Sequence, residues 1–378
     1  MERYPRPVDT DDRIEELSTL FAFLADHDFR GYSPLYEQIA RTMADDRRLL
    51  TFVDEAASPN ARRGRVPVLF HASLHDLTLT HPELELSRAF TEGAQIDLAA
   101  AISDAIDTHG DELIATMRTR SVQTNEVGRS AAIAAGLAAI DTGGRRIALV
   151  ELGPSAGLNL FVDRWHVEYR RDGAVVATTG PEASTVRLSC ELRGPLDPPF
   201  GSASPIAMRT GVDPSPIDAS DPKQAQWLRA CVWPGVPERD ERLAAALAVV
   251  GLEPPPLVRG DAVADLAPLV ASVDPDLFPV VLSTWALAYV SAEGRATIAE
   301  SLDRIGASRD LALLTLEEPR FTPHIPVTDA EVAAAFQPGD GTPTVLGRRV
   351  WHRGHATSTA LALCHPHARW MRWIDGGE

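Results

Sequence analysis

The chain has 378 residues, a net charge of −17 and a pI of about 5.1, with 44% apolar and 24% charged residues. This composition is ordinary for a folded globular protein, and the length predicts a main domain with a sizeable second one. Such an acidic chain repels phosphate backbones, so we expect neither a nucleic-acid partner nor, without an apolar run of ~18 residues, a membrane partner.

The first 140 residues are predicted to form a helical domain. Ile14, Leu17, Phe21 and Leu24 recur at helical spacing and give one apolar stripe. Ser33-Pro34 is typical of a helix start, with serine as the N-cap and proline in the first turn. His71, further along, is a candidate general base. The opening residues lack an apolar signal core, which predicts a cytoplasmic protein.

A dense polar cluster, Arg120-Ser-Val-Gln-Thr-Asn-Glu-Val-Gly-Arg129, precedes an Ala-rich helix expected at residues 130–140. Helix capping by Thr124 and Glu126 would account for part of it. Capping needs only one or two such groups, so we expect Gln123, Asn125 and Arg129 to face a substrate. Glu126 is a second candidate base.

The central stretch is Arg146-Ile-Ala-Leu-Val-Glu-Leu-Gly-Pro-Ser-Ala-Gly-Leu-Asn-Leu160. Residues 147–150 predict a buried strand, which ends in Glu151 and is followed by a turn with Gly153 and Gly157. A dinucleotide site has the pattern G-x-G-x-x-G, with its acidic residue after the glycines. Here the acid precedes the first glycine, and this order resembles the first motif of class I S-adenosylmethionine-dependent methyltransferases.

That resemblance implies a role for each residue of the turn. The acid that ends the strand, Glu151, would face the cationic methionyl amine. The loop that carries Pro154, Ser155 and Asn159 as well as the glycines would pass under the methionine moiety.

Residues 165–178 form two alternating runs around Asp172-Gly173, which predicts a β-hairpin within an insertion at about 164–205. Residues 206–212 predict the second strand of the sheet, with Asp213 at its carboxyl end. An acid there can accept hydrogen bonds from both ribose hydroxyls of a cofactor. Glu168 has the more regular spacing but belongs to the hairpin, which we expect to lie outside the sheet, so Asp213 is favoured.

Three further strands follow, at residues 257–259, 279–284 and 311–316. The first ends in Gly260-Asp261-Ala262, which resembles the methyltransferase motif that contacts the adenine amino group. Asp261 lies too far upstream to serve as the N-cap of the helix expected at residues 265–270. Along the next strand and its loop, Ser283 would contact the cofactor and Trp285 the substrate, while Tyr289 is a third candidate base.

Residues 344–352 and 359–364 predict a closing antiparallel hairpin. The fold class expected is therefore α/β: a Rossmann-like sheet of the class I methyltransferase type at residues 141–378 with a closing hairpin, an N-terminal helical domain and a β-hairpin insertion.

The chain also resembles domain of unknown function family 2332. The resemblance rests on Gln123-Thr-Asn-Glu-Val-Gly-Arg129, Glu151 to Leu160, Trp227-Leu-Arg-Ala-Cys-Val-Trp-Pro234, Arg259-Gly-Asp261 and the Pro-His run near the end. This bacterial family has no established activity and implies no substrate.

The motifs therefore predict an enzyme that transfers a methyl group from S-adenosylmethionine. The fourth strand lacks the Asn/Asp-Pro-Pro-Tyr motif of nitrogen methylation and has Ser283-Thr-Trp-Ala286 instead, which favours a small-molecule oxygen or carboxylate acceptor. Gly153-Pro-Ser155-Ala-Gly157 also spells the elbow of a serine hydrolase, which is the alternative. A third possibility is a ligand-binding protein without catalysis.

No metal is expected. His352, His355, His365 and His367 are close in sequence, but a hairpin points them to different faces. The three cysteines, Cys190, Cys231 and Cys364, are scattered and suit reduced structural thiols.

Overall fold

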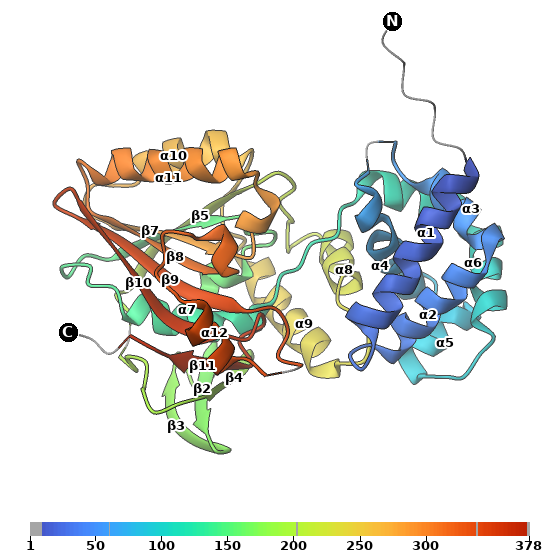
Figure 1. Cartoon of the computed structure of the whole chain (residues 1–378), viewed down its shortest axis with the longest axis horizontal. Helices are drawn as coiled ribbons and strands as arrows, with labels where there is room; N and C mark the ends of the chain where they lie inside the picture. Colours follow the sequence, from blue (N-terminus) through green and yellow to red (C-terminus); the bar gives the residue numbers. More distant parts are fainter. Residues whose placement is uncertain (1–9, 60, 202, 338, 376–378) are drawn as a thin grey trace, which may run out of the picture. The chain divides into compact units, whose positions relative to one another are not determined.

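The computed structural model describes residues 10–59, 61–201, 203–337 and 339–375 (Figure 1). The opening segment on which the prediction of a cytoplasmic protein rests lies outside these residues. The chain divides into two compact units. One comprises residues 1–124 and 222–241, and the other comprises 125–221 and 242–378.

The first unit is helical. Its elements are α1 (Thr10–Leu24), η1 (Ala25–Phe29), α2 (Pro34–Asp45), α3 (Arg47–Ala56), η2 (Arg63–Arg65), α4 (Val66–Thr80), α5 (Glu85–Glu92), α6 (Leu98–Thr119) and α8 (Pro222–Ala230). The predicted stripe Ile14, Leu17, Phe21 and Leu24 is buried in its core. Ser33 stands at the start of α2, but its hydroxyl donates to the carbonyl of Pro234 and does not cap the helix.

The second unit is built on one eleven-stranded sheet, in the order β3-β2-β4-β11-β10-β9-β8-β7-β1-β5-β6. The strands are β1 (Ile147–Leu152), β2 (His166–Arg171), β3 (Ala174–Thr179), β4 (Arg187–Leu192), β5 (Ile206–Asp213), β6 (Leu257–Arg259), β7 (Phe278–Thr284), β8 (Leu311–Glu317), β9 (Thr344–His352), β10 (His355–Cys364) and β11 (Trp370–Trp373). β6, β5, β1, β7 and β8 run parallel.

In chain order these five strands lie as 3-2-1-4-5, the arrangement of doubly wound sheets. The strand order reverses between β1 and β7, and the loops that follow these strands open at the same edge of the sheet. In such sheets ligands bind outside the carboxyl ends of the strands at this reversal. The topology therefore directs attention to the residues that end β1, β5, β7 and β8.

Helices and short helical turns precede or connect these strands. They are η3 (Val127–Arg129), α7 (Ser130–Ala138), η4 (Leu158–Arg164), α10 (Ala262–Ala271), η5 (Leu287–Tyr289), α11 (Ala292–Gly306), η6 (Pro319–Phe321) and α12 (Asp329–Ala335). Figure 1 shows α10 and α11 side by side over one face of the sheet. Val150 and Val281 of the sheet and Leu302 of α11 belong to one buried apolar cluster. The division between the units passes through α9 (Pro237–Leu252).

The predicted mixed α/β architecture is confirmed, including the β2–β3 hairpin and the closing β9–β10 hairpin. Two features differ from the prediction. The β2–β3 hairpin does not stand apart from the sheet, because β4 pairs with β2 and β11, and β11 in turn pairs with β10. The helical unit ends at Thr124, not at residue 140, and takes in residues 222–241, because α8 packs against α4.

Among the described residues, no helix is both long and apolar enough to cross a membrane.

Candidate functional site

Acidic side chains lie at or next to the carboxyl ends of three parallel strands in the second unit. Glu151 lies in β1, Asp213 is the last residue of β5 and Glu317 is the last residue of β8, with exposures of 1%, 5% and 0%. Buried carboxylates are costly unless they are paired or hydrogen-bonded. Three of them at one edge of a sheet mark this edge as the candidate functional site.

The loop after β1 is held in an unusual backbone conformation. Gly153, Ser155 and Gly157 all have positive φ values, of 68°, 55° and 74°. A Cβ on Gly153 would lie 3.0 Å from Ala286 in the loop after β7, and one on Gly157 would lie 2.7 Å from Pro255. The two glycines are therefore needed both for conformation and for close approach. The non-glycine Ser155 carries strain of the kind that occurs often at functional sites.

Asp213 holds this loop in place. One of its carboxylate oxygens accepts a hydrogen bond from the backbone N–H of Ser155 at 2.9 Å, and the other accepts one from the N–H of Ser215 at 2.7 Å. β5 pairs in parallel with β1, as the choice of Asp213 requires. Glu168 lies on β2, several strands away, and pairs there with Arg170. The long sequence separation between the glycine loop and Asp213 is thus due to an insertion, whose strands β2, β3 and β4 lie at the other end of the sheet.

Glu151 accepts a hydrogen bond from the Asn159 amide at 3.3 Å, and that amide also reaches the Thr284 hydroxyl at 3.4 Å. The Asn159 oxygen in turn accepts from Ser130. Burial raises the pKa of Glu151 to about 8, although the hydrogen bond from Asn159 and the charge of Arg129 lower it. Glu151 is therefore mainly protonated at neutral pH, and a bound cation would favour its ionisation.

Glu317 is a site residue that was not predicted. Its Oε1 accepts three hydrogen bonds, from the Ser283 hydroxyl at 2.7 Å and from the backbone N–H groups of Ala286 and Leu287 at 2.9 and 3.1 Å. Burial raises its pKa, against the effect of these donors. Its position at the end of a buried strand could have identified it from the sequence, because Glu151 and Asp213 are candidate residues for the same reason.

Arg129 supplies positive charge within this cluster. It is 5% exposed, donates from Nη1 to the carbonyl of Thr284 at 3.3 Å and from Nε to that of Pro366 at 3.1 Å, and lowers the pKa of both Glu151 and Glu317. It also lies over the ring of Trp285, at 5.9 Å from the centroid. Trp285 follows β7 and, like Ser155, has a positive φ, of 56°.

Several buried polar atoms at this edge have no hydrogen-bond partner among the described residues. They are Glu151 Oε2, Ser155 Oγ, Trp285 Nε1 and Glu317 Oε2. Such atoms are rare in native structures, and each one calls for an explanation, such as a catalytic role or a bound ligand, ion or water. The cluster offers carboxyl oxygens, a hydroxyl and an indole N–H, which suits a small polar ligand that carries positive charge.

The predicted site residues of the polar cluster at 120–129 do not all have the same surroundings. Asn125 donates from Nδ2 to the carbonyl of Pro154 at 3.2 Å and so supports the Gly153–Gly157 loop. Glu126 is the N-cap of η3 and pairs with Arg242 at 3.0 Å. The predicted capping role of Thr124 is therefore wrong, because Glu126 fills it. Gln123 belongs to the helical unit.

The other two candidate bases lie in contrasting environments. His71 is fully buried in the core of the helical unit, against the rings of Phe21, Phe29 and Tyr36, and burial lowers its pKa to about 4. Tyr289 ends η5 and is 55% exposed.

The interpretation of the Gly260-Asp261-Ala262 segment needs a correction. Asp261 is the N-cap of α10, which begins at Ala262, and it accepts a hydrogen bond from the backbone N–H of Val263. The helix begins three residues before Asp265, where the sequence predicts its start, and this brings Asp261 to the N-cap position. A Cβ at Gly260 would lie 2.3 Å from a carboxylate oxygen of Asp265, so a larger residue would require the Asp265 side chain to move. Asp261 keeps its place at the end of β6, where it is exposed.

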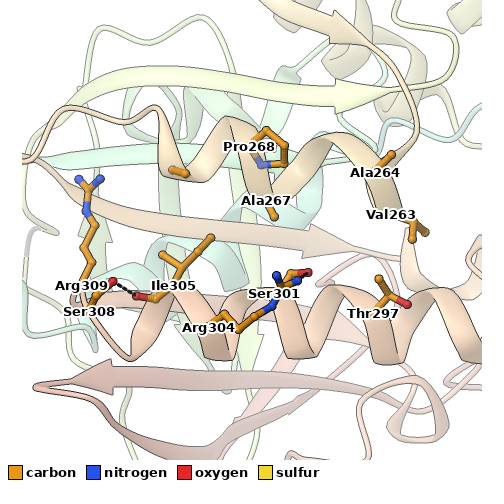
Figure 2. A pocket seen from close by; sticks show the side chains of 11 residues that line it. Val263, Ala264, Ala267, Pro268, Thr297, Ser301, Arg304, Ile305, Ser308 and Arg309 are labelled. Carbon is orange, nitrogen blue, oxygen red and sulfur yellow. Dashed lines mark hydrogen bonds between the residues drawn. The ribbon is translucent and has the colours of Figure 1, made fainter.

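A groove between α10 and α11 is separate from this cluster (Figure 2). It is lined by Val263, Ala267, Pro268, Ile305 and other residues of the two helices and the segment after α11. Its lining includes none of the buried acids and none of the predicted site residues.

The comparison with known families identifies a family for this chain but no activity. Residues 18–373 match a family described as an uncharacterised protein conserved in bacteria, domain of unknown function 2332. The chain belongs to this family. A search of curated proteins returned no significant match.

Proposed function

We propose that this member of family 2332 binds S-adenosylmethionine at the carboxyl ends of β1, β5 and β7 and transfers its methyl group to a small molecule. The observation that carries the proposal is the position of Glu151. This buried acid lies beside a strained glycine loop where the strand order reverses, and its Oε2 has no partner among the described residues. S-adenosylmethionine carries a cationic amine and an electrophilic sulfonium methyl.

The residues at this edge fit such a cofactor. Glu151 would accept from the amine and the loop from Gly153 to Gly157 would pass under the methionine moiety. Asp213 already accepts two backbone N–H groups, but each carboxylate oxygen has a second lone pair with which it could accept a ribose hydroxyl. Asp261 and Ala262 would lie at the adenine end.

The environment of the candidate bases favours an acceptor that needs no deprotonation. Glu126 is engaged by Arg242, His71 is enclosed in the helical core and Tyr289 is largely exposed. A carboxylate is already anionic at neutral pH, so its methylation requires positioning more than general-base catalysis. We therefore favour a carboxylate over a hydroxyl acceptor.

Calorimetry tests the cofactor. At pH 7 we expect S-adenosylmethionine and its demethylated product to bind with release of a proton, because Glu151, with a pKa of about 8, would ionise on meeting the amine. Proton release appears as a dependence of the measured heat on the ionisation enthalpy of the buffer. Asp213→Ala should weaken binding by ~1.5–3 kcal/mol, the range for a hydrogen bond to a charged group. Glu168→Ala, on the distant β2, is the control and should leave affinity unchanged.

No heat with either compound at millimolar ligand would refute the proposal. Binding that is insensitive to Asp213→Ala would show that the ribose contact is misplaced. Thermal unfolding of Asp213→Ala should be recorded in parallel, because loss of the bonds to Ser155 and Ser215 also loosens the loop.

A serine hydrolase is the second candidate, favoured by one observation. Ser155 lies at the tip of a Gly-Pro-Ser-Ala-Gly turn with a φ of 55°, and strain at the nucleophile is typical of such elbows. Against it, no histidine among the described residues hydrogen-bonds to the Ser155 hydroxyl, which is buried. Stoichiometric labelling by a fluorophosphonate, abolished by Ser155→Ala, would establish the hydrolase. Cofactor binding without methyl transfer to any carboxylate tested would indicate a non-catalytic ligand-binding protein.

A further inference from the structure

A second cluster of chemically capable side chains lies wholly within the helical unit. His81 caps the carboxyl end of α4, and His109 and Glu112 lie on α6, three residues apart. One nitrogen or oxygen ligand atom from each of the three lies within 4.8 Å of the others. The side chains of His81 and His109 are about one-fifth exposed and that of Glu112 is 45% exposed, so solvent ions can reach the cluster.

The distances match the needs of a small cation. His81 Nε2 lies 2.9 Å from Glu112 Oε2, and His109 Nδ1 lies 3.8 Å from the same oxygen. In a tetrahedral site with bonds of 2.0–2.1 Å, neighbouring ligand atoms are about 3.3 Å apart. The two observed distances lie on either side of that value, and small side-chain rotations would equalise them.

The backbone helps to bring the second imidazole into place. His109 has non-helical dihedral angles inside α6, with φ −128° and ψ 23°, directly before Gly110. The His109 and His81 rings are only 3.9 Å apart between centroids. An ion pair between His81 and Glu112 does not require a second imidazole at this distance.

A further carboxylate orients the first histidine. His81 Nδ1 lies 3.3 Å from Glu83 Oε1, while its Nε2 faces Glu112. Metal-binding histidines usually donate their other ring N–H to a carboxylate, which sets the tautomer and raises the basicity of the ligating nitrogen. His81 has this arrangement.

We propose that His81, His109 and Glu112 bind a divalent transition-metal ion, with water in the remaining position. Two imidazoles and one carboxylate are a donor set typical of Zn²⁺. Ca²⁺ and Mg²⁺ bind oxygen ligands, so the two imidazole nitrogens exclude them as natural occupants. The bound ion would join the end of α4 to the middle of α6. This site is independent of the proposed cofactor site.

The test uses the full chain, treated with a chelator that is then removed. Titration with Zn²⁺ in a calorimeter should show one saturable site, and Co²⁺ should give the visible absorption bands of a tetrahedral ion. Zn²⁺ should also raise the melting temperature, because the ion binds the folded state. His109→Ala preserves the His81–Glu112 pair but should weaken Zn²⁺ binding at least about tenfold.

Two further variants make the result specific. Glu112→Gln keeps the shape of the side chain and should also weaken binding at least about tenfold, which guards against misfolding of the histidine variant. His27→Ala is the matched control, because His27 is an exposed histidine of the same unit that lies between Asp26 and Asp28. It should bind Zn²⁺ as the wild type does. Absence of binding, or binding that both His109→Ala and Glu112→Gln leave unchanged, would overturn the proposal.

Discussion

Replacing Glu151 with glutamine should stabilise the protein at alkaline pH relative to the wild type. Burial raises the pKa of Glu151 from 4.5 to about 8, so the folded state favours the protonated form. The neutral glutamine has the same shape and can still accept the hydrogen bond from Asn159. At alkaline pH the wild type must either bury a charged carboxylate or take up a proton when it folds. The variant avoids both of these free-energy costs.

The direction of this stability change follows from the linkage between proton binding and folding. A group whose pKa is raised in the folded state contributes a stability that is fully present below its unfolded pKa, here 4.5, and that is lost as the pH rises through the folded pKa of about 8. A shift of this size corresponds to several kcal/mol, since one pKa unit is about 1.4 kcal/mol. The advantage of the variant should therefore grow between pH 5 and pH 9.

Urea unfolding of the two proteins at pH 5 and pH 9 measures this difference. Comparison with the wild type cancels the contribution of other titrating groups, including Glu317. Glu168→Gln is the control, because an ion pair with Arg170 lowers the pKa of Glu168 and no alkaline stabilisation is expected there. An equal difference between Glu151→Gln and wild type at both pH values would show that Glu151 is not held protonated.

Replacing Glu317 with alanine should cause a large loss of stability. Three donors would lose their acceptor, the Ser283 hydroxyl and the backbone N–H groups of Ala286 and Leu287. Each unsatisfied buried polar group costs about 1–3 kcal/mol, so for three donors we expect a loss of roughly 3–9 kcal/mol in the free energy of unfolding. Because the two N–H groups follow β7, any ligand binding at this edge should weaken as well.

Glu317→Gln should lose much less, since the amide oxygen can accept the same three bonds. Glu318→Ala is the neighbouring control. Glu318 pairs with the exposed Arg320, and such surface pairs contribute about 0–1 kcal/mol. The role assigned to Glu317 would be contradicted if Glu317→Ala and Glu318→Ala had similar unfolding free energies.

The strands of the central sheet could be predicted from local pattern. The apolar runs at 147–150, 279–284 and 311–316 are fully buried strands, as expected for a parallel sheet covered on both faces, and the run at 206–212 is a strand that is buried only in its second half. The same logic identified Glu151 and Asp213, since an acid that ends such a run must lie at the carboxyl edge. Asp213 was preferred to Glu168 because an alternating run around Asp172-Gly173 predicts a hairpin, which β2 and β3 form.

Long-range pairing decided what the sequence by itself could not. Pairing of β4 with β11 joins the insertion to the end of the chain, and no local pattern encodes a partner almost two hundred residues away. Glu317 became a site residue only when the fold brought Ser283 and the loop after β7 to it. His81 and Glu112 lie 31 residues apart, and only the packing of α4 against α6 makes them neighbours. Composition and periodicity determine which segments become strands and helices, whereas the chemistry of a site depends on which chain ends and loops the packing brings together.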